Sequence, residues 1–228
     1  MQARMRSLSD QPGPGEFDLP GVAPSRQKRS RETALALLTA GAAMLRTRSL
    51  AELSIEALCA EVGVTVGAFY SRFESKHAYF NALMALAARD GEQRLGDIRR
   101  PSPGTSLDAL CHIIVGGLIA WMRRHEGVLR AALQHDDTSP DQWSPFKALA
   151  QATTARATPV LLASMGKGRS AAKTRTIGFG FQVVLGTLVN AILNDPGPLS
   201  LSSKEMETRL AGCLCLLLQT EIHHSTPR

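Results

Sequence analysis

The chain has 228 residues, of which 44% are hydrophobic and only 5% aromatic. This length is enough for one large or two small domains with a buried core, and the composition suits a helical protein rich in leucine and alanine. Lys and Arg number 26 against 20 Asp and Glu, which gives a net charge of +6 and permits a polyanionic partner. The excess is not confined to one region, so charge alone does not identify a nucleic-acid-binding segment.

Other features argue against export, membrane insertion and catalysis. Residues 1–21 lack the apolar stretch of a signal peptide, and the longest apolar run, 113–122, is about half of what a bilayer requires. The cysteines form no C-x-x-C pair and are expected to be buried thiols in a reducing cytoplasm. No metal-ligand spacing and no catalytic arrangement has local support. We therefore expect a soluble cytoplasmic protein without metal or cofactor that is not an enzyme.

The N-terminal region has two parts. Residues 1–25 hold four of the twelve prolines and predict a disordered tail. The basic cluster that follows, from Arg26 to Arg31, is interpreted as an arm that contacts phosphates or the minor groove, with a solvated charged tail as the alternative. An apolar stripe then predicts an amphipathic helix over about 31–47 that braces the next segment.

Residues 54–76, SIEALCAEVGVTVGAFYSRFESK, have the pattern of two short helices joined by a tight turn. Ser54 is a good N-cap for a helix whose apolar positions recur at spacings of three and four. Gly63 follows where glycine can take a left-handed backbone without strain. Thr65 can cap a second helix that we expect to extend through Phe73. The pattern predicts a helix-turn-helix at about 54–73.

The second of these helices opens with small residues, which would let its backbone come close to the major groove and its first turn reach base edges. Polar and cationic side chains follow at spacings suited to phosphates on either side of the groove. The candidate DNA-binding residues are Arg29, Arg31, Ser54, Thr65, Val66, Gly67, Ala68, Tyr70, Ser71, Arg72 and Lys76.

The order Gly63-Val64-Thr65-x-Gly67-Ala68-Phe69-Tyr70-x-x-Phe73-x-Ser75-Lys76 resembles the recognition region of TetR-type transcriptional regulators. The resemblance covers about residues 30–90. Three positions depart from the family pattern: Val66 stands where the family often has Lys, Arg72 where it often has His, and Glu74 where it often has Pro. Val66 lacks a contact that a lysine would make, and Arg72 can replace one.

The pattern of the rest of the chain predicts helices throughout, so the predicted fold is all-α with about nine helices. One helix is expected over about 76–95, with Ser75 as its N-cap, and a break follows at 101–104. Five more are expected over about 105–124, 126–135, 141–165, 170–194 and 203–221. Pro145 and Pro159 are expected at the first turn and at a kink of the third of these. The predicted domains are a DNA-binding head at 26–91 and a helical ligand-binding and dimerisation domain at 92–228.

The helix at about 170–194 is apolar nearly all round and the last helix has an apolar stripe, so both must be covered. The resemblance implies that they form a dimer seam around a two-fold axis, whereas the residues alone leave a monomeric core as the alternative. The candidate seam residues are Val184, Leu188, Ala191, Leu210, Leu214 and Leu217.

The resemblance also implies an effector pocket inside the C-terminal domain. Aromatic and Met side chains with few polar groups would suit an apolar small molecule, and plain core is the alternative. The candidate lining residues are Trp121, Met122, His125, Phe146, Met165 and Phe179.

These observations favour a homodimeric transcriptional repressor that binds a palindromic double-stranded DNA operator and is released by a small apolar effector. One alternative is an all-α enzyme or small-molecule-binding protein with a vestigial helix-turn-helix. Another is a helical adaptor that binds a second protein through an exposed apolar patch.

Overall fold

The computed structural model describes residues 22, 28–97, 104–134, 144–166 and 171–224. Within these ranges the chain forms helices and no strand, which confirms the all-α prediction. The eight helices are α1 (Lys28–Met44), α2 (Ile55–Val62), α3 (Val66–Tyr70), α4 (Lys76–Asp97), α5 (Leu107–Gln134), α6 (Ser144–Ser164), α7 (Ala171–Asn194) and α8 (Lys204–His224).

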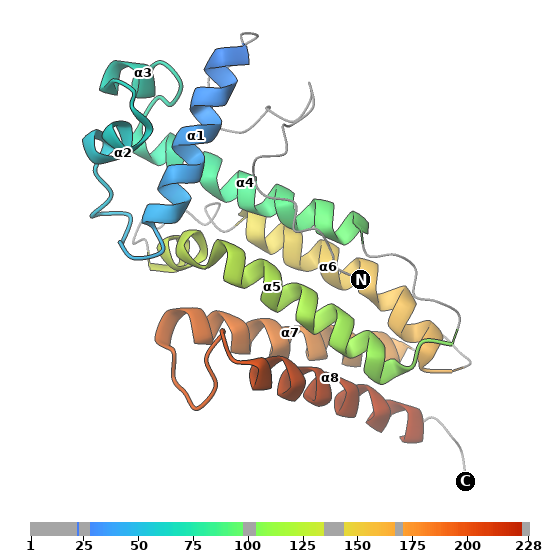
Figure 1. The fold of residues 1–228 in the computed structure, drawn as a ribbon. Coiled ribbons are helices and arrows are strands. Elements are labelled where there is room, and N and C mark those ends of the chain that lie inside the picture. Colours follow the sequence, from blue (N-terminus) through green and yellow to red (C-terminus); the bar gives the residue numbers. More distant parts are fainter. Residues whose placement is uncertain (1–21, 23–27, 98–103, 135–143, 167–170, 225–228) are drawn as a thin grey trace, which may run out of the picture.

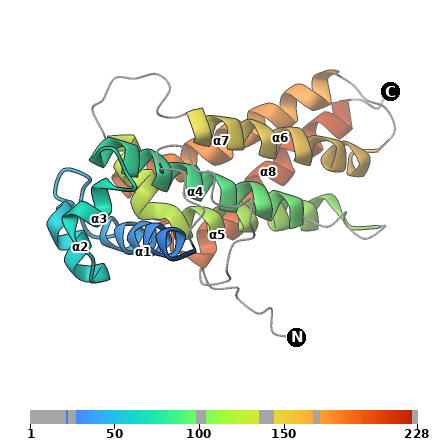
Figure 2. The same ribbon diagram turned by 90° about the horizontal axis from the view of Figure 1, so that it is seen from above.

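The helices are arranged as a small head joined to a larger bundle (Figures 1 and 2). The head consists of α1, α2 and α3 at one end of the molecule, and α4 runs from it along the bundle. The body consists of α5 to α8. Within it α5 is central, because it packs against α4, α6, α7 and α8 and also contacts α1 of the head. The body therefore meets the head both through α4 and directly through α5.

Two element predictions need correction. The first helix begins at Lys28, three residues earlier than expected, and ends at Met44. The separate helices expected at about 105–124 and 126–135 are one continuous helix, α5. The break expected near residue 125 is absent, and Gly127 close to it is also helical, because glycine inside a helix costs only about 1 kcal/mol relative to alanine. Pro145 lies in the first turn of α6 and Pro159 inside it.

Some predictions lie outside the described residues or stay untested. The expected tail at 1–25 is outside them except for Val22, and so is the break at 101–104 except for Gly104. The proposed domain boundaries stay predictions.

One helix, α7, is long and apolar enough to cross a membrane by length and composition alone. It packs against α5, α6 and α8, however. Packing against three helices of the body accounts for apolar residues on several sides of this helix without a membrane.

Candidate nucleic-acid interface

The helix α2 begins and ends as the sequence predicts. Ser54 has an extended backbone, and its hydroxyl accepts a hydrogen bond from the amide of Ala57 at 3.2 Å. At the other end Gly63 has φ +72° and donates its amide to the carbonyl of Ala60 at 3.2 Å. A Cβ added at Gly63 would meet no atom within 4 Å. Glycine is therefore favoured here by the left-handed backbone and not by lack of space.

The recognition helix α3 begins as predicted but is shorter than expected. Thr65 is its N-cap and accepts the amide of Ala68 at 3.1 Å. The helix ends at Tyr70, so the expectation that it extends through Phe73 is wrong. The amide of Arg72 bonds to the carbonyl of Phe69 at 2.9 Å, an i to i+3 bond that tightens the last turn. The Ser71 hydroxyl also donates to the carbonyl of Ala68, at 2.9 Å, and so occupies a group that a further helical turn would use.

Three buried aromatic rings hold α3 against the rest of the head. The centroids of the Phe69, Phe73 and Tyr79 rings lie 4.9–5.3 Å from one another, and all three side chains are fully buried. The Tyr79 hydroxyl donates to the carbonyl of Leu37 in α1 at 2.7 Å, and burial raises the pKa of Tyr79 above its ordinary value. Gly41 faces this hydroxyl, which a Cβ would overlap. The cluster thus fixes α3 relative to α1 and α4.

The opposite side of α3 is open. Thr65, Gly67 and Ser71 are exposed, and the Tyr70 side chain is 53% exposed. Val66 and Ala68 are half-buried, so the first turn presents a low surface of small side chains. Such a surface can approach another molecule closely, with the exposed Tyr70 at its edge.

Two of the predicted cations are already bonded within the head. The Nε atom of Arg72 donates to the carbonyl of Ser30 at 3.2 Å, which ties the end of α3 to the first turn of α1. The Nζ atom of Lys76 donates to the carbonyl of Ala51 at 3.2 Å. The sequence does not reveal these partners. Whether the same side chains also contact phosphates stays a prediction.

The basic cluster is helical where it is described. Lys28, Arg29, Ser30 and Arg31 form the first turn of α1, so the interpretation of these residues as an arm in front of the helix is wrong, and Arg26 and Gln27 lie outside the described residues. Arg29 is exposed and Arg31 is half-buried. Positive side chains at a helix N-terminus oppose the helix dipole. Their placement is therefore not explained by the stability of α1, and a nearby anion would relieve the repulsion.

Sequence reasoning missed a turn between α1 and α2. The Glu52 carboxylate accepts from the amide and the hydroxyl of Ser49 at 2.8 and 2.9 Å, and the Glu52 amide donates to that hydroxyl at 3.3 Å. The hydrogen bonds from Ser49 lower the pKa of Glu52. The spacing Ser-x-x-Glu is the signal that could have predicted this pairing. Ala51, whose carbonyl binds Lys76, lies inside the turn.

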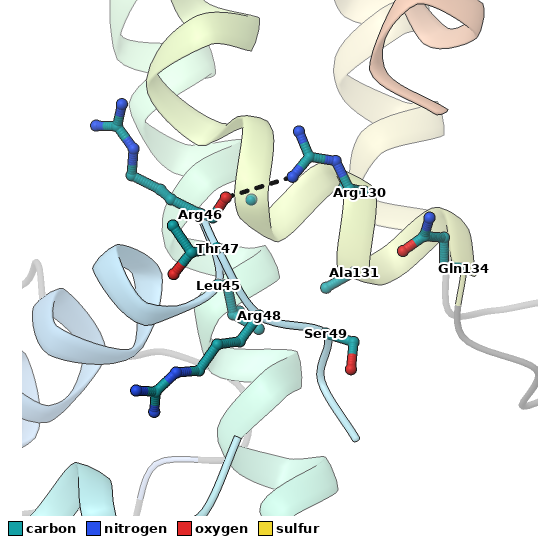
Figure 3. A pocket seen from close by; sticks show the side chains of 9 residues that line it. Leu45, Arg46, Thr47, Arg48, Ser49, Arg130, Ala131 and Gln134 are labelled. Carbon is teal, nitrogen blue, oxygen red and sulfur yellow. Dashed lines mark hydrogen bonds between the residues drawn. The ribbon is translucent and has the colours of Figure 1, made fainter. Parts of the chain in front are cut away.

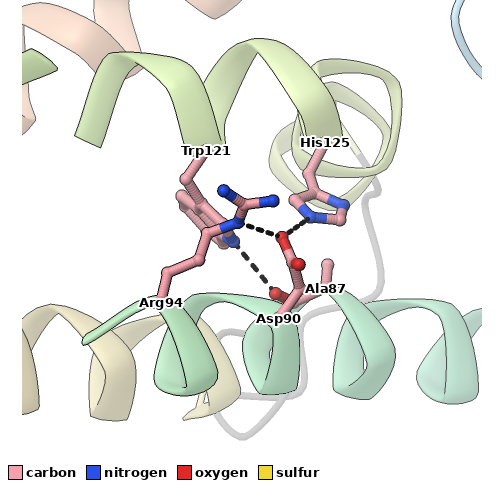
Figure 4. Close-up of polar contacts among 5 residues, drawn as sticks. All are labelled: Ala87, Asp90, Arg94, Trp121 and His125. Atoms are coloured by element: carbon pink, nitrogen blue, oxygen red, sulfur yellow. Dashed lines mark hydrogen bonds and ion pairs between the residues drawn. The ribbon is translucent and has the colours of Figure 1, made fainter. Parts of the chain in front are cut away.

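Two of the candidate pocket residues, Trp121 and His125, form polar contacts with α4 (Figure 4). Trp121 donates its Nε1 to the carbonyl of Ala87 at 3.0 Å, and His125 lies 2.9 Å from the Asp90 carboxylate. Arg94 donates to the same carboxylate oxygen at 2.9 Å. Burial alone would raise the pKa of Asp90, but the hydrogen bonds from His125 and Arg94 hold it at about 2. This polar cluster joins α4 to α5.

The other candidate pocket residues separate into two places. Met122, Phe146 and Met165 are buried, and the Phe146 and Trp121 ring centroids lie 6.0 Å apart. Phe179 does not lie with them, because its side chain is 54% exposed on the outside of α7. The pocket prediction is therefore wrong for Phe179. For the remaining residues it stays a prediction.

The candidate seam residues face the inside of a single chain. Five of the six are buried within the protomer, with at most 6% of each residue exposed, and Leu217 is half-buried; the five are Val184, Leu188, Ala191, Leu210 and Leu214. The assignment to a dimer seam is therefore wrong for these five, and for Leu217 it stays a prediction. A stripe at helical spacing identifies an apolar face, but it does not say which neighbour covers that face.

The outward faces of α7 and α8 carry other residues. Phe179 and Leu216 are 54% and 64% exposed. Gly178, Gly186 and Gly212 are open, because a Cβ added at any of them would meet no atom within 4 Å. Cys213 is also exposed here, contrary to the expectation that all cysteines are buried; Cys59, Cys111 and Cys215 are buried as predicted. We call these positions on α7 and α8 together the outer face: Gly178, Phe179, Gly186, Gly212, Cys213 and Leu216.

Comparison with known proteins gives two findings. Residues 37–83 match the family model described as bacterial regulatory proteins, tetR family. This range contains all of α2 and α3 with the adjoining parts of α1 and α4. No curated protein sequence matches the chain.

Solved structures share the overall fold. A tetR-family transcriptional regulator from Streptomyces coelicolor superposes with a TM-score of 0.62 at 16% identity, over 85% of this chain and 83% of that one. A regulator described as a putative TetR-family protein from Rhodococcus sp. gives 0.61 at 16% identity, over 82% and 99%. Salmonella enterica GusR gives 0.59 at 15% identity, over 86% and 100%. At these identities the similarity establishes the fold, head and body together.

Proposed function

Since the chain has the N-terminal domain and the fold of TetR-family transcriptional regulators, we propose that it is a homodimeric repressor that binds a palindromic DNA operator and releases it when a small molecule binds. The observation that carries the proposal is the exposed first turn of α3. It presents small residues and the exposed Tyr70 outward, while an aromatic cluster fixes the helix from behind.

The residues of the head divide into two roles on this proposal. Thr65, Gly67 and Ala68 lie where a helix entering the major groove contacts base edges, so they determine which sequence is read. Tyr70, Arg29 and Lys76 contact phosphates and set the position of the head. The positive first turn of α1 supports the second role, because it lies beside α3 through the bond from Arg72 to Ser30.

The outer face supports the proposed homodimer. It carries two exposed large apolar residues, Phe179 and Leu216, on two neighbouring helices, and its three glycines leave room for another helix to approach closely. A two-fold axis through this face would bring α7 and α8 of two copies together. Two heads at a fixed separation could then enter successive major grooves, about 34–36 Å apart or a multiple of this.

The proposed effector is a small, mainly apolar molecule. Trp121 and Phe146 lie in ring contact beside the polar cluster that joins α4 to α5, and Met122 and Met165 are buried thioethers of the body. A molecule bound there would act on DNA binding only through different affinities for two arrangements of the heads. A hundredfold loss of DNA affinity requires about 2.7 kcal/mol of coupling, and DNA must weaken effector binding equally.

Selection of DNA from a random library by the purified full chain tests the proposal. We expect a palindromic sequence to be enriched and its binding to weaken steeply with salt. Lys76→Ala should weaken binding to selected and random duplexes alike and reduce the salt slope by about one unit. Thr65→Leu should instead change the selected sequence. Failure to enrich any sequence, together with salt-independent binding, would favour a small-molecule-binding protein with a vestigial head.

A further inference from the structure

The end of α5 touches the head backbone to backbone. Gly127 is buried, and a Cβ added there would lie 2.5 Å from the carbonyl carbon and oxygen of Leu45 and 2.7 Å from the amide nitrogen of Arg46. These atoms belong to the main chain directly after α1. They cannot move aside as the end of a flexible side chain could, so any side chain at position 127 would displace the head from α5.

One helical turn further along α5, Arg130 bonds to two other elements at once. Its Nη1 donates to the carbonyl of Arg46 in the head at 3.4 Å, as Figure 3 shows. Its Nε donates to the carbonyl of Ile192 near the end of α7, also at 3.4 Å. Glu126 pairs with the same guanidinium. Because the donors of a guanidinium lie in one rigid plane, a shift of α7 relative to the head changes the geometry of both bonds.

A hollow of about 190 Å³ lies between the chain after α1 and the end of α5. Residues 45–49 line one side, and Gly127, Arg130, Ala131 and Gln134 line the other. The Arg46 and Arg48 side chains extend away from it (Figure 3). The head is therefore not packed continuously onto this end of α5, and the contacts of Gly127 and Arg130 bridge an incompletely filled junction.

We propose that Gly127 and Arg130 form a joint that couples the end of α7 to the orientation of the head. The inference rests on the proposed function, because α7 carries the outer face on which the two copies would meet. A head attached through α4 alone can rotate about that helix, whereas a second attachment at α5 fixes its angle. Both residues are positioning residues, since they act on DNA through the head. A change at the outer face would thus reach the recognition helix through Arg130.

The chain provides a matched control for each residue of the joint. Arg123 lies on α5 seven residues earlier and donates to the carbonyls of Leu201 and Ser203, just before α8. These hydrogen bonds hold the segment before α8 and lie within the body. Gly117 also lies inside α5, and a Cβ added there would meet no atom within 4 Å. Alanine favours a helix at both glycine positions, so helix propensity cannot explain a difference between them.

Hydrogen exchange on the full-length protein tests the joint without DNA. The amides of Arg46, Thr47 and Leu53 are hydrogen-bonded in the structure and therefore have protection to lose. We expect Arg130→Gln and Gly127→Ala to speed exchange over residues 45–53 by about threefold to tenfold, as the loss of a charged hydrogen bond or of close contact implies. Arg123→Gln should affect residues near 201–203 only, and Gly117→Ala neither region. Exchange over 45–53 that is unchanged in both joint variants, or equally fast in Arg123→Gln, would overturn the proposal.

A DNA measurement separates positioning from a merely structural role. The duplex that the wild-type protein selects is resynthesised with its half-sites one or two base pairs closer or farther apart. We expect the wild type and both control variants to prefer the original spacing, and Arg130→Gln and Gly127→Ala to discriminate less between spacings. Variants of the joint that keep the wild-type spacing preference would contradict the proposal. If the wild type selects no duplex, the proposed function fails, while hydrogen exchange still decides the joint.

Discussion

The head and the outer face both carry large apolar side chains on helices. The chain itself buries those of the head and leaves those of the outer face exposed. In the head, Phe69, Phe73 and Tyr79 are fully buried among α1, α3 and α4. On the outside of α7 and α8, Phe179 and Leu216 stay 54% and 64% exposed. Exposed apolar patches on soluble proteins mark interaction sites. The head therefore buries its aromatic core within one chain, whereas the outer face leaves two large apolar residues exposed, which a second copy would cover on the proposed function.

The largest effect we expect distinguishes the inner from the outer side of these helices. Leu188 is fully buried, so Leu188→Asp places a charge in the core and should cost about 4 kcal/mol or more, with loss of the folded body. Leu216→Asp should leave the helical content unchanged and dissociate the dimer. Circular dichroism with sedimentation velocity measures both. A Leu216→Asp protein that stays dimeric would show that the outer face is not the seam.

The next effect tests the close packing of Gly41 against Tyr79 inside the head. Gly41→Ala should destabilise the protein by about 1–3 kcal/mol, because the added methyl overlaps the Tyr79 hydroxyl in a packed core. Tyr79→Phe removes that hydroxyl, at a cost of about 1 kcal/mol for its bond to Leu37. In the Tyr79→Phe background Gly41→Ala should cost less. Urea unfolding measures the loss of unfolding free energy that Gly41→Ala causes in each background. Equal losses would mean that the added methyl does not contact the Tyr79 hydroxyl.

A change of the unfolding free energy with pH, of similar or smaller size, tests the polar cluster that joins α4 to α5. The pKa of Asp90 is about 2 in the folded chain against 3.8 ordinarily, so its ionised form stabilises the fold above about pH 4. That contribution, about 2 kcal/mol, is lost as the pH falls from 4 toward 2. Asp90→Asn should lack this part of the pH dependence. Unfolding curves of both proteins between pH 2.5 and 7 measure it, and parallel profiles would refute the assignment.

The sequence predicted the head well because its structure depends on local signals. Ser54, Thr65 and Ser75 are N-caps whose partners lie three residues away, and Gly63 takes the left-handed backbone that its place after a helix indicates. Each of these interactions joins residues within one short segment, so the local sequence pattern can indicate it. The bonds from Arg72 to Ser30 and from Tyr79 to Leu37 each span 42 residues, and no local pattern reveals them.

The body was predicted less well for the same physical reason. Helical spacing correctly predicted α6, α7 and α8 to within a few residues. It could not tell that Leu188 and Leu214 face their own chain while Leu216 faces outward, since several sides of these helices are apolar. No local pattern reveals what Gly127 contacts. A glycine in a helix can mark an end or a close contact, and only the position of Leu45 decides between them.

The central claim is that the open first turn of α3 reads DNA sequence. Gly67 tests it most directly, because a Cβ there would meet only the Thr65 hydroxyl, at 3.9 Å, so a larger side chain can be accommodated without disturbing the fold. Glu61→Gln, on the exposed end of α2, is the control. The measurement is fluorescence anisotropy with the selected duplex and with random DNA.

We expect Gly67→Gln to keep the wild-type unfolding curve and its affinity for random DNA. Its affinity for the selected duplex should fall by about tenfold to a hundredfold, which corresponds to about 1–3 kcal/mol at a base contact. The control should bind both duplexes as the wild type does. A folded Gly67→Gln protein with undiminished affinity for the selected duplex would contradict the account.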